Sequence, residues 1–255
     1  MRDSDANTAV QPHLPALRNV GLSGVLISFS QQLTESANRA ALAFRSAIDA
    51  AAISGVLETS TSLTSTFVRY DLCRISNQQL RDRLTHLLDQ QDWLQAELPL
   101  SRRLWRIPTA FGGIYGPQLE EAAALAGISP AKAIQMITAD PLRVLTIGFA
   151  PGQPYLGVLP DAWDIPRQPV LTKKVPEGAL VTAIRQLIVF TAATPTGWRH
   201  IGQTAFRGFR PENAAPFSLR PGDEVQFVEV AAAELDAIGH RDSSGDGGAE
   251  IVALQ

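Results

Sequence analysis

Apolar positions recur at helical spacing in two segments of the first part of the chain and alternate with polar positions in two others. Residues 33–52 are rich in alanine and predict a helix, and a leucine stripe predicts a second helix over 77–92 with Ser76 as its N-cap. The apolar segment 20–30 predicts a strand, whereas the β-branched residues of 56–70 predict one bent strand or a pair. The order β-α-β-β-α predicts a small open sheet with helices on one face.

A linker over 96–103 separates this part from one of different texture. Gly116 followed by Pro117, and Ser129 followed by Pro130, each predict the start of a helix with proline at its first position. Short apolar runs between glycines and prolines predict strands over 104–108, 142–147, 179–184, 187–192, 199–204 and 224–230. Short strands at this spacing favour a barrel or a sandwich.

The fold class that follows is α+β, with a small N-terminal domain over 19–97 and a β-rich domain over 104–232. The polar segment 1–18 is predicted to be a flexible N-terminus. Residues 240–250 are rich in glycine, serine and aspartate and poor in apolar side chains, so we expect a flexible tail over 236–255.

Composition excludes several classes of protein. Hydrophobic residues make up 45% of the chain and charged residues 18%, which is enough apolar material for a substantial core. The net charge of −3 gives no strong field, and no apolar run approaches the roughly 18–20 residues that span a bilayer, so we expect neither a nucleic-acid nor a membrane partner. Cys73 is the single cysteine, which favours the cytoplasm and a buried, inert thiol.

Compact catalytic motifs are absent from the sequence. There is no P-loop, no GxGxxG loop, no HExxH pair and no GxSxG elbow. The histidines are isolated in sequence, so no metal site is expected. Met1 and Met136 are the only methionines, so the chain lacks the Met-Lys-Met setting of a covalently biotinylated lysine. An enzyme with this sequence would use distributed polar groups.

Two turns rich in glycine and proline are predicted to frame a small-molecule pocket in the β-rich domain. In the first, over 148–157, Phe149 and Tyr155 either form an apolar wall for a flat ligand or cover the core. In the second, Trp198 is placed as a pocket lid or as a core anchor. His200 shares a strand face with Trp198 and is either a general base or a hydrogen-bonded, half-buried histidine.

Two more segments carry candidate binding groups. Residues 108–119 expose backbone N–H groups before a helix, which suits an anion or a tight strand-to-helix connection. Over 166–178, the cations Arg167, Lys173 and Lys174 stand between prolines. They are either a solvated edge or are held rigidly for the recognition of carboxylate or phosphate.

These four segments, in this order, resemble the family of the 5-oxoprolinase B subunit, also called allophanate hydrolase subunit 1, which includes the Kip-type kinase inhibitors. Family members show PVxYGGxxGPDL, GFxPGFxYLG, PR, VPxGSV, QTGIYP, SPGGWxLIGRT and P-x-LL-x-x-GD-x-V-x-F. The corresponding segments here read PTAFGGIYGPQL, GFAPGQPYLG, PRQPVLTKKVPEGALV, RQLIVF, TPTGWRHIGQT and FSLRPGDEVQF. The match covers 106–228, and the preceding half also looks like the family's N-terminal domain.

The resemblance implies a small N-terminal α/β sandwich domain followed by a cyclophilin-like β-barrel of the carboxyltransferase type. It implies a related partner chain, the C-type component, and a third subunit, with which this chain would hydrolyse 5-oxoproline to glutamate using ATP with Mg. Such a complex is an ATP-dependent cyclic-amide hydrolase. Two alternatives stay open: a carboxyltransferase component acting on urea or a similar small amide with carboxybiotin from another chain, and a non-catalytic, Kip-like regulator of a histidine kinase.

Candidate site residues follow from the matched motifs. Those expected to be catalytic are Arg167, Gln186 and Thr204. Those expected to bind substrate or nucleotide are Phe149, Gly152, Tyr155, Lys174, Trp198 and Gly202, and no metal ligand is expected. The two cations would bind carboxylate or phosphate, Gln186 and Thr204 would orient the amide, and Phe149 and Trp198 would enclose the ring.

The sequence also departs from the family pattern. Phe111 replaces a tyrosine, Gln118 an aspartate, Gln153 a phenylalanine and Thr196 a glycine. The QTGIYP segment has become QLIVFT, which replaces an open polar turn with bulk. We therefore expect either a smaller ligand site than the family has or no ligand site, as in a diverged paralogue with an altered substrate or none.

Overall fold

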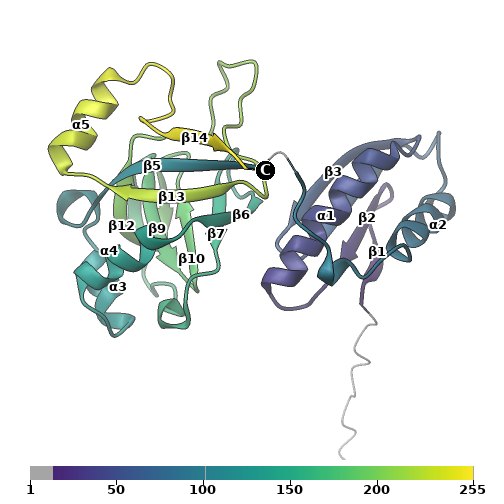
Figure 1. The fold of residues 1–255 in the computed structure, drawn as a ribbon, viewed down its shortest axis with the longest axis horizontal. Helices are drawn as coiled ribbons and strands as arrows, with labels where there is room; N and C mark the ends of the chain where they lie inside the picture. Colours follow the sequence, from purple (N-terminus) through teal and green to yellow (C-terminus); the bar gives the residue numbers. More distant parts are fainter. Residues whose placement is uncertain (1–13, 101, 255) are drawn as a thin grey trace, which may run out of the picture. The chain divides into compact units, whose positions relative to one another are not determined.

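Two units make up the chain in the computed structural model, which describes residues 14–100 and 102–254 (Figure 1). The first unit is Met1–Leu98 and the second is Pro99–Gln255. Of the segment 1–18 that we expected to be flexible, 1–13 lies outside the described residues, whereas Ala16–Val20 forms a strand. No helix in the described part of the chain is long and apolar enough to cross a membrane.

An antiparallel sheet with the strand order β1-β2-β4-β3 forms the first unit together with two helices. In chain order the elements are β1 (Ala16–Val20), β2 (Gly24–Ser28), α1 (Glu35–Ala51), β3 (Val56–Ser62), β4 (Ser65–Tyr70) and α2 (Asn77–Leu88). Val25 and Val68 of the sheet are buried in one cluster with Phe44 of α1 and Leu80 of α2. The unit is thus an α+β pair of layers, as predicted.

Side-chain caps define where both helices begin. The Thr34 hydroxyl accepts the N–H of Ala37 at the start of α1. At α2, Ser76 and Gln79 form a reciprocal capping box, which confirms Ser76 as the predicted N-cap. A cap of this kind contributes about 1 kcal/mol of helix stability.

The strand predicted over 20–30 is wrong as a single element, because the chain turns at Gly21 and forms the hairpin β1–β2. Gly21 has a φ of +60°, a left-handed conformation that glycine adopts without a Cβ clash. The apolar residues on both sides of the turn hid it in the pattern. The segment 56–70 is a pair of strands, β3 and β4, which was one of the two alternatives.

The second unit is built around a closed barrel. Its elements are β5 (Arg103–Phe111), α3 (Leu119–Leu125), α4 (Pro130–Ala139), β6 (Leu142–Ile147), β7 (Pro154–Gly157), β8 (Thr172–Val175), β9 (Ala179–Ala183), β10 (Gln186–Val189), β11 (Thr194–Thr196), β12 (Arg199–Thr204), β13 (Glu224–Glu229), α5 (Ala232–Arg241) and β14 (Glu250–Ala253). The ring runs β12-β9-β10-β7-β6-β13-β5, and the pairing of β12 with β5 closes it. Of the two predicted architectures, the structure is the barrel.

Strand β5 has three partners, and two of them share one edge. On one edge it pairs in parallel with β13. On the other edge β14 pairs with its first part, from Arg103 to Arg106, and β12 pairs with its last part, from Thr109 to Phe111 (Figure 1). Pro108 falls between these two partners, where a residue without an N–H costs no ladder hydrogen bond. The predicted strand 104–108 is therefore the interior of a longer one.

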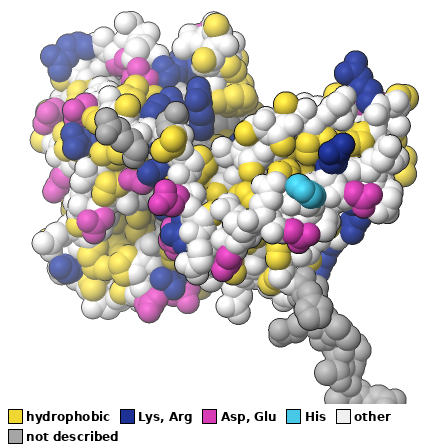
Figure 2. Space-filling model, turned by 45° about the vertical axis from the view of Figure 1, so that its right-hand side comes forward, with side chains coloured by type: hydrophobic (Ala, Val, Ile, Leu, Met, Phe, Trp, Pro, Cys, Tyr) yellow, Lys and Arg dark blue, Asp and Glu magenta, His cyan; other side chains and the backbone are white. Residues whose placement is uncertain are grey.

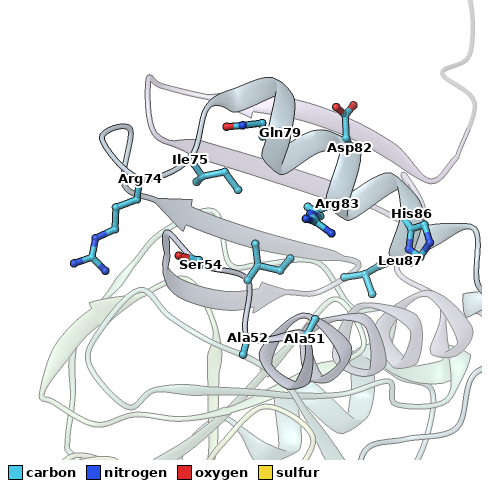
Figure 3. A pocket seen from close by; sticks show the side chains of 11 residues that line it. Ala51, Ala52, Ser54, Arg74, Ile75, Gln79, Asp82, Arg83, His86 and Leu87 are labelled. Atoms are coloured by element: carbon cyan, nitrogen blue, oxygen red, sulfur yellow. The ribbon is translucent and has the colours of Figure 1, made fainter.

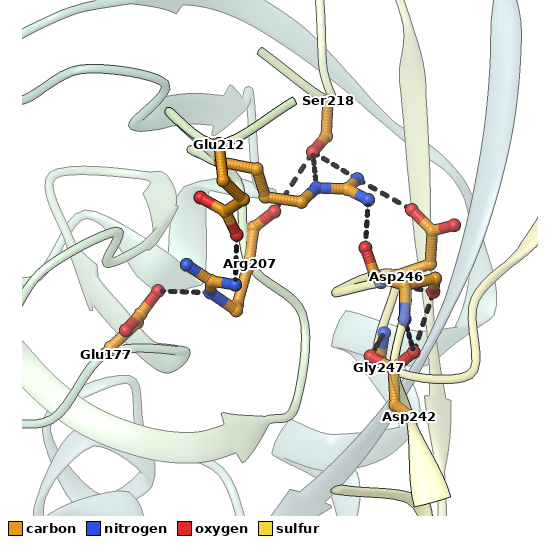
Figure 4. Close-up of polar contacts among 9 residues, drawn as sticks. Glu177, Arg207, Glu212, Ser218, Asp242, Asp246 and Gly247 are labelled. Atoms are coloured by element: carbon orange, nitrogen blue, oxygen red, sulfur yellow. Dashed lines mark hydrogen bonds and ion pairs between the residues drawn. The ribbon is translucent and has the colours of Figure 1, made fainter. Parts of the chain in front are cut away.

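The structure differs from the flexible tail that we expected over 236–255, because this segment holds the end of α5 and the whole of β14. Arg210 anchors it: its Nη2 lies 2.7 Å from the Asp246 carboxylate and its Nη1 donates to the Ser244 carbonyl at 2.6 Å (Figure 4). The Asp242 carboxylate accepts the N–H of Gly247 at 2.7 Å.

The glycines that suggested disorder are needed for close packing. Gly247 has a φ of +61°, and a Cβ at this position would lie 2.4 Å from the backbone nitrogen of Phe206. Composition alone cannot distinguish a glycine-rich segment that is disordered from one that is folded tightly against a neighbour.

Replacing Asp242 with alanine is expected to loosen this segment. Burial alone would raise the pKa of Asp242, but hydrogen bonds from the Ser244 side chain and from backbone N–H groups outweigh it and lower the pKa. This stabilisation is present above the carboxyl's unfolded pKa near 3.8 and is lost as the pH falls through the folded value. At neutral pH we expect limited proteolysis within 242–249 to be about fivefold faster, the effect of ~1 kcal/mol. Asp164→Ala, at an exposed aspartate in the same unit, is the control, and equal cleavage rates for the two variants would contradict the prediction.

Candidate functional site

A pocket of about 320 Å³ lies among the β6–β7 loop, β7, β10, the segment before β8 and the β11–β12 turn. Its main apolar lining comes from Phe149, Tyr155, Leu171, Ile188, Phe190 and Trp198. Its polar lining comes from Gln153, Arg167, Gln168 and Thr196. The volume is at the lower end of the range for small-molecule sites, so the pocket suits a small ring-sized ligand. Both turns that were predicted to frame a pocket contribute to it.

An aromatic pair and one cation form the most specific part of the lining. The rings of Tyr155 and Trp198 meet edge to face, with centroids 6.1 Å apart. The Arg167 guanidinium carbon lies 5.4 Å from the centre of the Trp198 ring. Arg167 has no ion pair with any described residue, so its N–H groups stay available to an anion while the indole holds the group in place.

The segment that carries Arg167 is fixed by the residues on either side of it. The Pro166 carbonyl accepts a hydrogen bond from Nη1 of the buried Arg199 at 2.5 Å. The Gln168 N–H donates to the Gly197 carbonyl at 2.7 Å, which ties this segment to the turn before Trp198. The backbone that carries Arg167 is therefore anchored on both sides of this residue.

Gln118 and Gln168 bridge this segment to β12. Gln118 Nε2 donates to Gln168 Oε1 at 2.6 Å, and Gln118 Oε1 accepts the N–H of His200 at 3.0 Å. An amide supplies both the donor and the acceptor that these contacts need, whereas an ionised aspartate offers acceptors only. Gln168 thus supplies the acceptor that the amide at position 118, unlike the aspartate of the family pattern, can use. Both residues position the segment that carries Arg167 against β12.

Gln153 is the buried polar group of the pocket. Its side chain is only 1% exposed, and its Oε1 has no hydrogen-bond partner among the described residues. Its backbone is satisfied, since its N–H donates to Ala150 and its carbonyl accepts from Gly148. An unpaired buried acceptor costs about 1–3 kcal/mol. Because Oε1 is inaccessible to water in the empty pocket, this cost falls on the fold.

Phe149 stands at the mouth of the pocket. It is 80% exposed and has a φ of +69°, a left-handed conformation that costs a non-glycine residue about 1–2 kcal/mol. Strained backbone of this kind concentrates at functional sites. Of the two sequence-based alternatives for Phe149, the structure favours a pocket wall over a cover for the core.

The other predicted site residues lie outside the lining. The Thr204 hydroxyl donates to the Gly178 carbonyl at 3.0 Å and accepts from Phe206, so it holds a turn. Gln186 is buried at the start of β10, and Lys174 is exposed on β8.

The two remaining glycines permit close approaches of backbone. A Cβ on Gly152 would lie 2.5 Å from the Gly208 carbonyl oxygen, and one on Gly202 would lie 3.0 Å from that of Ala110 in β5. Sequence reasoning had missed the roles of Gln153 and Gln168. Gln153 was visible only as a departure from the family pattern, and Gln168 only as the neighbour of Arg167.

A family model described as carboxyltransferase domain, subdomain C and D, matches residues 15–219. The chain belongs to this carboxyltransferase family. The resemblance to the 5-oxoprolinase B subunit is confirmed as well, since the chain is 29% identical over 235 residues to that subunit from Bacillus subtilis (strain 168). That alignment covers 87% of this chain and 95% of the relative.

Two solved structures resemble the fold of this chain. TTHA0988 is 29% identical with a TM-score of 0.68, over 85% of this chain and 40% of that one, so this chain spans less than half of TTHA0988. The urea carboxylase of Kluyveromyces lactis has a TM-score of 0.72 at 16% identity, over 93% of this chain and 24% of that chain. At this identity the likeness concerns the fold alone, and it confirms the α+β class with a carboxyltransferase-type barrel.

A larger hollow of about 610 Å³ lies in the first unit, between α2 and the end of α1 (Figure 3). Arg74 and Asp82 extend outward from it, whereas Arg83 lies between the two elements. It contains none of the residues that the carboxyltransferase motifs point to. We place the candidate site in the smaller pocket, because aromatic rings and a cation without an ion pair converge there.

Surface charge and the cysteine add little to the site. Acidic and basic side chains are interspersed over the face that Figure 2 shows, in keeping with the small net charge.

Cys73 is exposed, so the expectation of a buried thiol is wrong. It lies in the turn between β4 and α2. In the described part of the chain, no group of three His, Cys, Asp or Glu side chains is arranged to hold a metal ion.

His200 is buried in β12, outside the pocket lining, and its Nε2 has no partner among the described residues. Burial lowers the pKa of His200, although the neighbouring Gly202 backbone and Gln203 side chain act in the opposite direction. As the pH falls, His200 of the unfolded chain therefore becomes protonated first, near pH 6.5. The contribution of neutral His200 to folding stability is present above that pH and is lost below it. We expect the urea midpoint of unfolding to fall between pH 7.5 and pH 5, and to fall less in His200→Gln. An equal fall in both proteins would contradict this.

Proposed function

We propose that this chain is the B-type component of an ATP-dependent complex that hydrolyses 5-oxoproline to glutamate. The observation that carries the proposal is the similarity to the 5-oxoprolinase B subunit of Bacillus subtilis over nearly the whole length of that relative. The pocket supports it, because its size and lining suit one small ring that bears an anionic group.

Different lining residues would bind different parts of the substrate ring. The Arg167 guanidinium would form charge-assisted hydrogen bonds to the ring carboxylate. Tyr155, Trp198 and Phe149 would enclose the apolar faces of the ring and exclude water from it. These residues bind and orient the substrate. Four other predicted residues would contribute indirectly, by shaping the barrel around the pocket: Gln186, Thr204, Gly152 and Gly202. Lys174 would lie farther out than the bound carboxylate.

The pocket does not fit ATP with Mg. Its described lining offers one guanidinium and no carboxylate, whereas Mg²⁺ is bound through carboxylate oxygens and phosphates. A triphosphate also needs more cationic or backbone N–H donors than Arg167 supplies. We infer that another chain of the complex binds the nucleotide, and that this chain contributes the ring-binding pocket. The partners would be a C-type chain with a carboxyltransferase domain and a third 5-oxoprolinase subunit.

A carboxyltransferase component is the second candidate function, and the description of the matching family favours it. In that case the same pocket would hold urea or a similar small amide, and a carboxybiotin carried on another chain would supply the carboxyl group. Urea has no carboxylate, so Arg167 would then have no anionic group of the substrate to bind.

The test is to purify the chain with its C-type partner and the third 5-oxoprolinase subunit and to measure ADP release with 5-oxoproline. Turnover that requires this chain is the expected result, and its absence overturns the proposal. Carboxylation of urea that depends on carboxybiotin would support the second candidate. Inhibition of histidine kinase autophosphorylation without ATPase activity would support a Kip-like regulator.

A further inference from the structure

The pocket of the second unit lacks a base for the chemistry of the proposed function. When water opens a cyclic amide, its oxygen joins the new carboxylate, the ring C–N bond breaks and the nitrogen gains a proton, so a positioned group must accept a proton from the water. The described lining holds no histidine, carboxylate, lysine or cysteine. Its one phenol is Tyr155, and a phenol holds its proton too tightly to be that base near neutral pH. The base therefore comes from outside this lining.

Exposed apolar side chains lie at the mouth of the same pocket. Phe149 and Leu171 line the pocket and are 80% and 59% exposed, and Val170, next to Leu171, is 78% exposed. Leu171 also lies against the β11–β12 turn, since a Cβ on Gly197 would be 3.5 Å from its Cδ2. We call Phe149, Val170 and Leu171 the mouth patch. Exposed apolar patches with a polar rim commonly mark sites where another protein binds.

The charge beside the mouth patch indicates which kind of surface fits it. The segment 166–175 contains Arg167, Lys173 and Lys174 and no acidic residue. None of these three cations forms an ion pair with a described residue. A second copy of this chain would bring the same positive charges together in a two-fold contact, and a flat lipid surface cannot reach into a concave pocket. An acidic surface of a different protein fits best.

We propose that the mouth patch is the docking face for the C-type chain of the complex. The docked surface of that chain is acidic and carries an apolar side chain that packs against Val170 and Leu171. The docked chain covers the pocket and supplies the base that the pocket lacks. This inference rests on the proposed function, and it assigns the contact between two of its chains to one face of the barrel unit.

The test measures binding of the C-type chain to the whole purified chain by calorimetry. Val170→Ser is the main variant, because Val170 is exposed and lies outside the pocket lining, so its replacement leaves the fold and the pocket intact. It is expected to weaken binding about tenfold, as the loss of an apolar anchor does. Lys173→Glu is expected to weaken binding by a similar factor at low salt and by less at high salt.

Ile114→Ser and Lys132→Glu are the matched controls. Ile114 is 85% exposed and Lys132 is an exposed lysine of α4, and neither lines the pocket. Both variants should bind the C-type chain within about twofold of wild type. A second readout is the concentration of C-type chain that gives half-maximal ADP release. It should rise about tenfold in Val170→Ser, whereas the maximal rate should not change, because saturation restores docking.

The outcomes separate this inference from the proposed function. The docking face is overturned if the C-type chain does not bind, if Val170→Ser binds it as tightly as wild type does, or if Val170→Ser disrupts only self-association or binding to vesicles of phosphatidylcholine and phosphatidylserine. The proposed function then still stands if the complex releases ADP with 5-oxoproline. If the C-type chain docks as expected but no ADP is released, the proposed function is overturned and the docking face stands.

Discussion

Replacing Arg167 with alanine is expected to raise the KM for 5-oxoproline about 10–100-fold and to change kcat little. The reason is that hydrogen bonds to a charged group contribute about 1.5–3 kcal/mol, and Arg167 is the one cation of the described pocket lining. Arg167 is exposed and forms no ion pair with a described residue, so its replacement is expected to leave the fold intact. The measurement is steady-state ADP release by the assembled complex over a range of substrate concentrations.

Lys174→Ala is the control for this prediction, because it removes a nearby positive charge from the same basic segment but not from the pocket. Its KM should stay within about twofold of the wild-type value, as expected for an exposed charge. If Lys174→Ala raised KM as much as Arg167→Ala, the pocket would be wrongly placed. If neither did, the carboxylate would bind elsewhere.

Replacing Gly116 with alanine is expected to destabilise the second unit by about 3 kcal/mol, since a Cβ there overpacks a well-packed contact. Gly116 has a φ of −155°, so conformation is not the constraint. The Cβ would lie 2.0 Å from the carbonyl oxygen of Ile201 in β12, which forces the turn after β5 away from the barrel. Thermal unfolding followed by tryptophan fluorescence should show a midpoint about 6–12 °C lower.

Gly148→Ala provides the comparison for Gly116→Ala. A Cβ at Gly148 would meet no atom within 4 Å, and its φ lies outside the left-handed region. Its midpoint should therefore match that of wild type within about 1–2 °C, given that surface substitutions stay within ±0.5 kcal/mol. Equal midpoints for the two variants would mean that the turn after β5 adapts without cost.

Much of the barrel could be predicted because its strands are short apolar runs with breakers at both ends. β6 and β12 have the predicted bounds, and α4 begins at Pro130 behind its Ser129 cap. Local signals decided these elements. β14 gave no such signal, because its pairing with β5 is set by a partner far away in sequence.

The site was predictable only in part, for a similar reason. Phe149, Tyr155, Arg167 and Trp198 come from matched motifs and do meet in one pocket. Thr204 matched equally well, yet its hydroxyl is used by the Gly178 carbonyl, a contact that no local pattern reveals. The unpaired state of Gln153 depends on which side chains surround it, so it becomes visible only in three dimensions.

The shared edge of β5 has a consequence for synthesis on the ribosome. β5 emerges early, but β12, β13 and β14 emerge much later, so β5 waits without its ladder partners while most of the second unit is made. Domains generally fold as units in N-terminal order, and such non-local pairings form slowly. The first unit can fold during translation, whereas the barrel closes only after β13 has left the exit tunnel, and β14 completes the edge of β5 later still. The interval in which β5 stays unpaired is when the nascent chain has most need of a chaperone.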